Sequence, residues 1–216
     1  MSTFGFPWFR LWVRPFVPNI DALPEGERAY YEDFLLATFN NPARVDLNND
    51  MMWNFLTVEQ AEMLKRRVDE QVLSQLDRAI DLFRVGEVAG ATVPTVMVDQ
   101  RDRLLAARCY YTTMRNTAAW IEAVHGYMQA AAAERKSYYR VLCEEMVACE
   151  SANARNLLAL WNTSHVSFMP ISSVGESLHI YGSNFGDLLG RKISLMERHA
   201  QDEPFIDPQY MWRLRN

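Results

Sequence analysis

Apolar residues recur at steps of three and four along much of the chain, which is the spacing of one face of an α-helix. The clearest stretch runs from Thr57 to about Arg84. Thr57 followed by Gln60 has the pattern of a capping box, so we predict that a helix begins there. The apolar stripe of this helix consists of Ala61, Leu64, Val68, Val72, Leu76, Ala79 and Phe83.

The longest stretch, residues 100–162, contains no proline and a single glycine, Gly126. A lone glycine costs a helix only about 1 kcal/mol, so we predict one continuous helix here. At ~1.5 Å per residue it would be on the order of 95 Å long. The alternative is that the helix breaks near Gly126 and folds back into a compact bundle.

Two shorter helices are expected on either side of these long ones. One follows Pro24 and ends near Phe39, where Asn, Asn and Pro follow one another. The other runs over residues 173–199 and begins with a second capping box, Ser173 and Glu176. We therefore predict an all-α fold: an elongated antiparallel bundle built on one long central helix with two flanking hairpin helices, those over 57–84 and 173–199.

The ends of the chain are predicted to be extended, aromatic arms. The expected organisation is an N-terminal arm over residues 1–23, a helical domain over 24–201 and a C-terminal arm over 202–216. Prolines interrupt both arms, so neither is expected to be helical. Their aromatic side chains need an apolar surface to cover them, and we predict that they bind a partner subunit: Phe6, Trp8, Phe9, Trp12, Phe16, Tyr210 and Trp212.

Two other surfaces can receive the N-terminal aromatics. The first is the protein itself, if the arm docks back onto exposed apolar stripes. The second is a membrane surface, because aromatic rings beside Arg10 and Arg14 suit the boundary between headgroups and acyl chains.

Composition narrows the class of protein. The chain has 216 residues, of which 49% are hydrophobic and 23% charged, and no apolar run has the roughly 18 residues that a membrane span needs. The net charge of -5 argues against binding to nucleic acid. The three cysteines form no disulfide framework or zinc motif, and the N-terminus lacks the apolar core of a signal peptide, so we expect a cytoplasmic protein.

Four glycines share one face of the expected C-terminal helix: Gly175, Gly182, Gly186 and Gly190. Glycine weakens a helix, so such a face predicts a compensating close approach of a neighbouring helix. In hairpin register that neighbour presents Ala148, Ala152 and Ala154. The alternative is that the glycines break this segment into turns.

Two Glu-x-x-His pairs are the main chemical candidates: Glu122 with His125, and Glu176 with His179. Two such pairs on facing helices, with further glutamates, build a di-iron or di-manganese carboxylate site. A continuous helix over 100–162 would hold the two pairs roughly 48 Å apart, which argues against the site unless the helix breaks or two subunits share it.

A single-metal site at His125 is the remaining metal alternative, with Glu59 or Glu62 approaching Glu122 from the neighbouring helix. No phosphate loop, dinucleotide fingerprint or nucleophile motif occurs in the chain. We therefore expect no cofactor and a non-enzymatic structural or scaffolding subunit of a homo- or hetero-oligomer. The alternatives are a di-metal oxidase or oxygenase, which would need iron or manganese, and a peripheral membrane protein.

Overall fold

The structure is a computed structural model that describes residues 12–32, 57–88, 93–166 and 185–206. In this part of the chain all regular elements are helices, which confirms the all-α prediction. The β pairing seen among the described residues is an isolated bridge between Asn19 and Phe205. The elements are α2 (Glu25–Glu32), α4 (Val58–Val68), a π-helical turn η3 (Asp69–Leu73), α5 (Ser74–Val88), α6 (Thr95–Gln129), α7 (Ala133–Thr163) and α9 (Phe185–Arg198).

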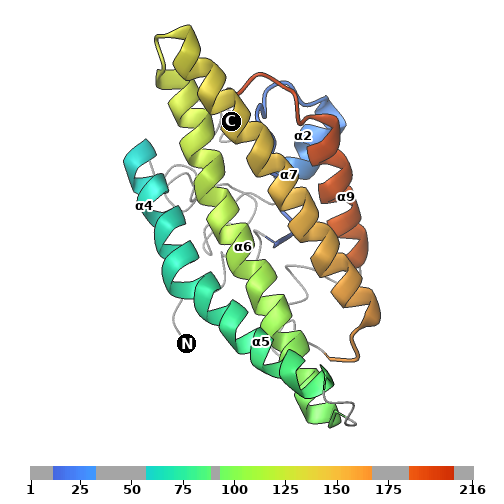
Figure 1. Ribbon diagram of the computed structural model, residues 1–216. Helices are drawn as coiled ribbons and strands as arrows, with labels where there is room; N and C mark the ends of the chain where they lie inside the picture. The colour runs from blue at the N-terminus through green and yellow to red at the C-terminus, as the bar shows by residue number, and fades with distance from the viewer. Residues whose placement is uncertain (1–11, 33–56, 89–92, 167–184, 207–216) are drawn as a thin grey trace, which may run out of the picture.

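The long helices lie side by side in an elongated antiparallel arrangement (Figure 1). α4 and α5 follow one another through η3 and pack on α6, α7 packs on the other side of α6, and α9 packs on α7. The central helix is α6. Ion pairs seven residues apart on α6 fix its register against α4, η3 and α5: Lys65 with Glu122, Asp69 with Arg115, and Asp77 with Arg108.

The prediction of one continuous helix over 100–162 is wrong. α6 ends at Gln129, and Ala130 and Ala132 have extended backbone before α7 begins. Folding back lets α6 and α7 bury one another, and their contact is the most extensive between two helices of the described chain. A straight helix would leave Trp120 and Met146, both now in the core, without this cover.

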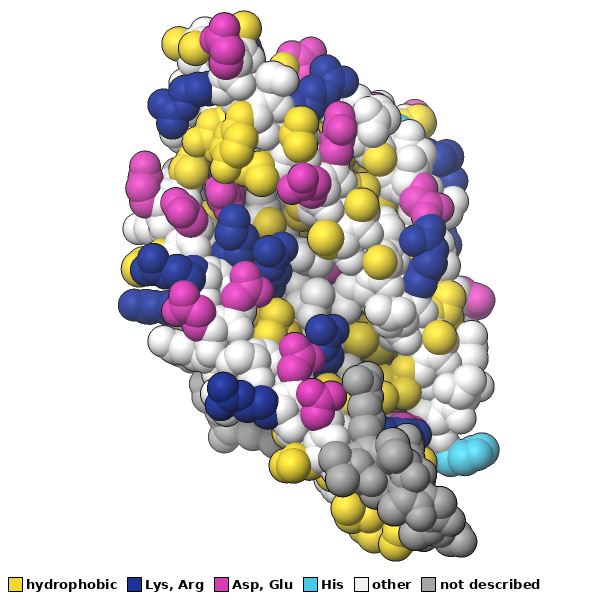
Figure 2. All heavy atoms as spheres, viewed as in Figure 1, with side chains coloured by type: hydrophobic (Ala, Val, Ile, Leu, Met, Phe, Trp, Pro, Cys, Tyr) yellow, Lys and Arg dark blue, Asp and Glu magenta, His cyan; other side chains and the backbone are white. Residues whose placement is uncertain are grey.

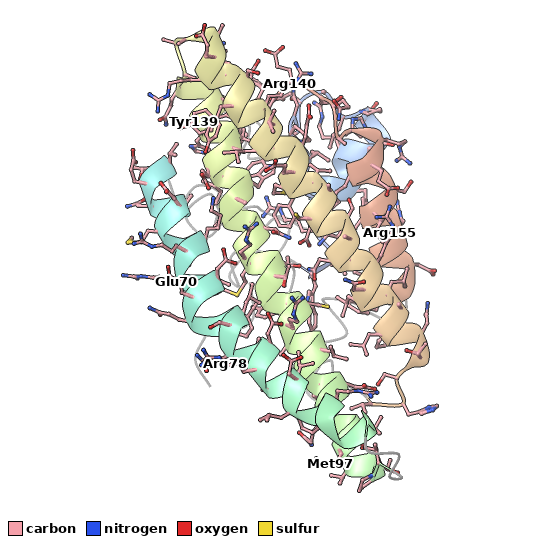
Figure 3. All side chains as sticks on the ribbon, in the orientation of Figure 1. Glu70, Arg78, Met97, Tyr139, Arg140 and Arg155 are labelled. Carbon is pink, nitrogen blue, oxygen red and sulfur yellow. The ribbon has the colours of Figure 1, made fainter. Side chains whose placement is uncertain are left out.

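Gly126 permits the close approach of the two arms of this hairpin. The ring of Tyr139, labelled in Figure 3, lies against its backbone. A Cβ atom at position 126 would be 2.3 Å from Cε1 of that ring. The alternative prediction, a helix that breaks near Gly126 and folds back, is therefore confirmed. The glycine contributes by admitting the Tyr139 ring, and the turn itself lies four residues later, at Ala130.

The predicted helix starts at Thr57 and after Pro24 agree with the structure, whereas the stretch predicted from residue 100 begins at Thr95. The hydroxyl of Thr57 accepts a hydrogen bond from the backbone N–H of Gln60 at 3.2 Å, as the capping box predicted. The helix after Pro24 is present as α2. Residues 185–198 of the predicted C-terminal helix are helical, whereas Ser173 and Glu176 lie outside the described residues.

The N-terminal arm forms part of the core, which corrects the prediction that Trp12 and Phe16 bind a partner. Their exposed fractions are 3% and 0%. The chain from residue 12 to 20 runs behind α6 and α7 in Figure 1, and the indole N–H of Trp120 donates to the carbonyl of Val17 at 2.7 Å. This burial is the self-docking alternative, and it removes Trp12 from any membrane-inserting surface.

The beginning of the C-terminal arm lies beside the N-terminal one. The backbone N–H of Phe205 donates to the carbonyl of Pro18 at 3.0 Å, and Ile206 is buried. The other predicted partner-binding aromatics, Phe6, Trp8, Phe9, Tyr210 and Trp212, lie outside the described residues. None of the described helices combines the length and the apolar content needed to cross a bilayer.

Candidate functional site: a groove between α2 and α9

A buried ionic network holds α9 in place. Lys192 of α9 and Glu150 of α7 form an ion pair in which both side chains are 0% exposed. Glu150 also accepts from the hydroxyl of Thr113 at 2.7 Å and from the amide of Asn116 at 2.8 Å, and Lys192 donates to the carbonyl of Trp12 at 2.9 Å. The network therefore ties α6, α7, α9 and the N-terminal segment together.

Burial decides the electrostatics of this network. Loss of water lowers the pKa of Lys192 below its ordinary 10.5, and the neighbouring Glu150 carboxylate only partly opposes that effect. Because the carboxylate has its charge partner and two further donors inside the protein, the arrangement is a satisfied structural network. The network therefore fixes α9 through its buried side, while the opposite side of the helix faces outward.

A groove of about 490 Å³ lies on the other side of α9, between this helix and α2. Its walls combine glycine backbone, an aromatic ring and charged groups. They include Gly26, Glu27 and Tyr30 from α2 and Gly186, Gly190 and Arg191 from α9.

No described residue approaches the glycines of this groove so closely that a side chain would be excluded there. Among the described residues, no atom lies within 4 Å of the Cβ position of Gly26 or Gly190. A Cβ at Gly186 would meet Trp161 at 3.5 Å and Leu158 at 3.6 Å, which is ordinary contact. None of these glycines has a left-handed backbone, so an alanine fits at each position.

The predicted close helix packing is therefore not what the described chain shows at α9. Gly186 lies against the large side chains of Trp161 and Leu158 in place of the alanines of α7, and Gly190 faces open space. Gly175 and Gly182 lie outside the described residues. The glycine face lines the groove.

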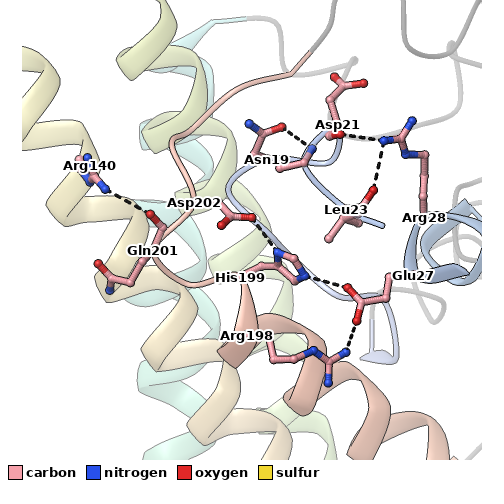
Figure 4. Close-up of polar contacts among 11 residues, drawn as sticks. Asn19, Asp21, Leu23, Glu27, Arg28, Arg140, Arg198, His199, Gln201 and Asp202 are labelled. Atoms are coloured by element: carbon pink, nitrogen blue, oxygen red, sulfur yellow. Dashed lines mark hydrogen bonds and ion pairs between the residues drawn. The ribbon is translucent and has the colours of Figure 1, made fainter. Parts of the chain in front are cut away.

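A charged cluster connects Glu27 and Arg198 of the groove wall with His199 and Asp202 (Figure 4). The ring of His199 lies between two carboxylates, with Nε2 2.7 Å from Glu27 and Nδ1 2.7 Å from Asp202. The guanidinium of Arg198 also pairs with Glu27. Because Glu27 belongs to α2 and Asp202 follows α9, the cluster joins α2, the end of α9 and the segment after it.

The electrostatics of Glu27 follow from these contacts. Burial alone would raise its pKa, but the hydrogen bonds from His199 and Arg198 outweigh it and hold the pKa of Glu27 below its ordinary 4.5. The Glu27 carboxylate is thus ionised when it binds Arg198 and His199. We call these three residues the clamp, which joins α2 to α9, the two walls of the groove.

Two further charges stand on the open wall of the groove. The guanidinium of Arg191 lies over the ring of Tyr30, 4.0 Å from its centroid. Asp187 lies one turn earlier on α9, and both charged residues are exposed. Neither forms an ion pair with any residue of the described chain.

The structure uses the predicted metal ligand Glu122 differently. Its carboxylate pairs with Lys65 of α4, and its side chain is only 8% exposed. His125 is half-buried, whereas Glu59 and Glu62 are exposed. Glu176 and His179 lie outside the described residues, and within the described chain no group of three or more histidine, cysteine or acidic side chains is placed so that it could hold a metal ion.

Sequence reasoning identified Gly186 and Gly190 but missed the α2 wall. Gly26 inside the predicted helix after Pro24 was the available signal, since glycine is unfavourable there.

No protein family, characterised protein or solved structure matches this chain.

Proposed function

We propose that the chain is a non-enzymatic structural or scaffolding subunit, and that the groove between α2 and α9 receives a helix of another protein subunit. The observation that supports this most directly is the set of glycines on the groove walls. Gly26 and Gly190 face a space that no described residue fills.

The energetics of glycine make this observation informative. A glycine in a helix interior costs about 1 kcal/mol relative to alanine. At Gly126 the compensation lies within the chain, because the Tyr139 ring occupies the space of a side chain. At Gly190 the described chain offers no such compensation, so we place it in a partner whose backbone approaches α9 closely.

The rigidity of the walls also suits a binding groove. Lys192 anchors α9 from the core, and the clamp of Glu27, Arg198 and His199 joins α9 to α2. A groove whose walls are fixed before binding loses less conformational entropy when the partner docks. Aromatic and arginine groups such as Tyr30 and Arg191 are typical of the residues that dominate interface energy.

The test compares alanine at two glycines in urea unfolding of the chain at a concentration where sedimentation shows a monomer, so that no loss of partner contacts enters the comparison. We expect Gly190→Ala to raise the free energy of unfolding by up to about 1 kcal/mol, because the methyl enters open space and favours the helix. The matched control, Gly126→Ala, places the same methyl against Tyr139 and should lower it. A Gly190→Ala chain less stable than the wild type would show that this glycine serves the fold, and would refute the proposal.

A further inference from the structure

The charges on the groove wall indicate what the groove receives. We propose that the occupant is a second copy of this chain: α9 of each copy lies antiparallel against α9 of the other, within the groove that α2 completes. This inference rests on the proposed function and adds the identity of the partner and the register of the contact.

The register follows from the positions of the two charges. In an antiparallel pair of α9 helices whose two-fold axis passes beside residue 189, Asp187 of one copy stands opposite Arg191 of the other. The symmetry makes this pairing reciprocal, so one contact forms two ion pairs. In the same register Gly190 of one copy stands level with Leu188 of the other, midway between Gly186 and Gly190 of that copy. The two glycine faces therefore overlap along the helix axis, and the charges fix the register.

Both charged groups are suited to that contact. In the described chain Asp187 has no cation partner, and Arg191 is held over the ring of Tyr30 with no carboxylate partner. Stacking on Tyr30 restricts the guanidinium, and Arg191 is exposed, so a carboxylate of a partner can reach it. A foreign helix would have to supply an acid and a base at matching positions, whereas a second copy carries both.

The experiment measures the mass of the full-length chain by sedimentation equilibrium over a range of concentrations. The variants are Asp187→Arg, Arg191→Asp and the two combined. Each single variant places like charges opposite each other twice, so we expect the dimer dissociation constant to rise at least about tenfold. The combined variant restores opposite charges and should return it to within about threefold of the wild type.

Glu145→Arg is the matched control, because it makes the same change of charge at an exposed position of α7 away from the groove. It should leave the dimer unchanged. A chain that stays monomeric at every concentration overturns the inference. So does a dimer that ignores the single substitutions, or single variants that the combined variant fails to rescue. The proposed function is judged separately, by the stability of Gly190→Ala, so the failure of one is distinguishable from the failure of the other.

Discussion

The buried pair of Lys192 and Glu150 gives the sharpest test of how this fold is held together. Replacing Lys192 by methionine keeps most of the side-chain volume but removes the charge. The Glu150 carboxylate then keeps its bonds from Thr113 and Asn116 but loses its counter-charge, and the carbonyl of Trp12 loses its donor. Breaking one side of a buried ion pair costs about 3–5 kcal/mol.

That loss is large against the about 5–15 kcal/mol that stabilises a typical domain. For a chain of this size it corresponds to a fall in melting temperature on the order of 10 °C. Urea unfolding followed by circular dichroism and by tryptophan fluorescence measures it. Glu150→Gln should cost a similar amount, because it removes the carboxylate that pairs with the buried Lys192 ammonium.

The double variant separates an ion pair from two independent contributions. Once Lys192→Met has removed the ammonium, Glu150→Gln removes an unpaired charge, so the double variant should lose at least about 2 kcal/mol less than the sum of the singles. Lys136→Met is the control, since this exposed lysine lies over the Tyr127 ring, and it should cost less than about 1 kcal/mol. A loss below about 1 kcal/mol for Lys192→Met, or additive single effects, would refute the reasoning.

Three further outcomes are expected. Gly126→Ala should lower the free energy of unfolding by about 1–2 kcal/mol, since overpacking against Tyr139 exceeds the gain in helix propensity, and Tyr139→Leu in the same background should recover part of it. With a thiol reagent at pH 8, Cys149 alone should react in the folded chain, because burial raises the pKa of the other two thiols to about 12. The pKa of Glu27 lies below 4.5, so its contribution to stability is complete above that pH and is lost as the pH falls through the lower folded value. The difference in unfolding free energy between wild type and Glu27→Gln should therefore shrink as the pH falls below 4.5.

Helix positions could be read from the sequence because they depend on local spacing. The Thr57 cap and the stripe that follows it concern residues within one or two turns of each other, and the structure confirms them. The break between α6 and α7 is different, because no proline or glycine stands at Ala130–Ala132. The chain turns there because of the apolar surface that the hairpin buries, and that gain depends on residues far apart in sequence.

The position of the N-terminal arm could not be predicted from the local sequence either, because it too depends on residues far apart in the chain. Aromatic residues such as Trp12 signal only that an apolar surface must cover them, and a partner, a membrane and the protein's own core all meet that need. The outcome depends on Trp120 and Lys192, which supply donors to the buried carbonyls of the arm from positions more than a hundred residues away in sequence. An extended segment can enter a helical core only when such donors are present.

The two faces of α9 explain why part of the candidate site could be foreseen and part could not. Its outer face is a pattern within one helix, so Gly186 and Gly190 were visible as a surface suited to close approach. Its inner face carries Lys192, whose partners come from α7 and from the N-terminal segment. Because Lys192 fixes the helix from within, α9 keeps its position although no described residue packs on Gly190, and this is the face on which we propose that a partner docks.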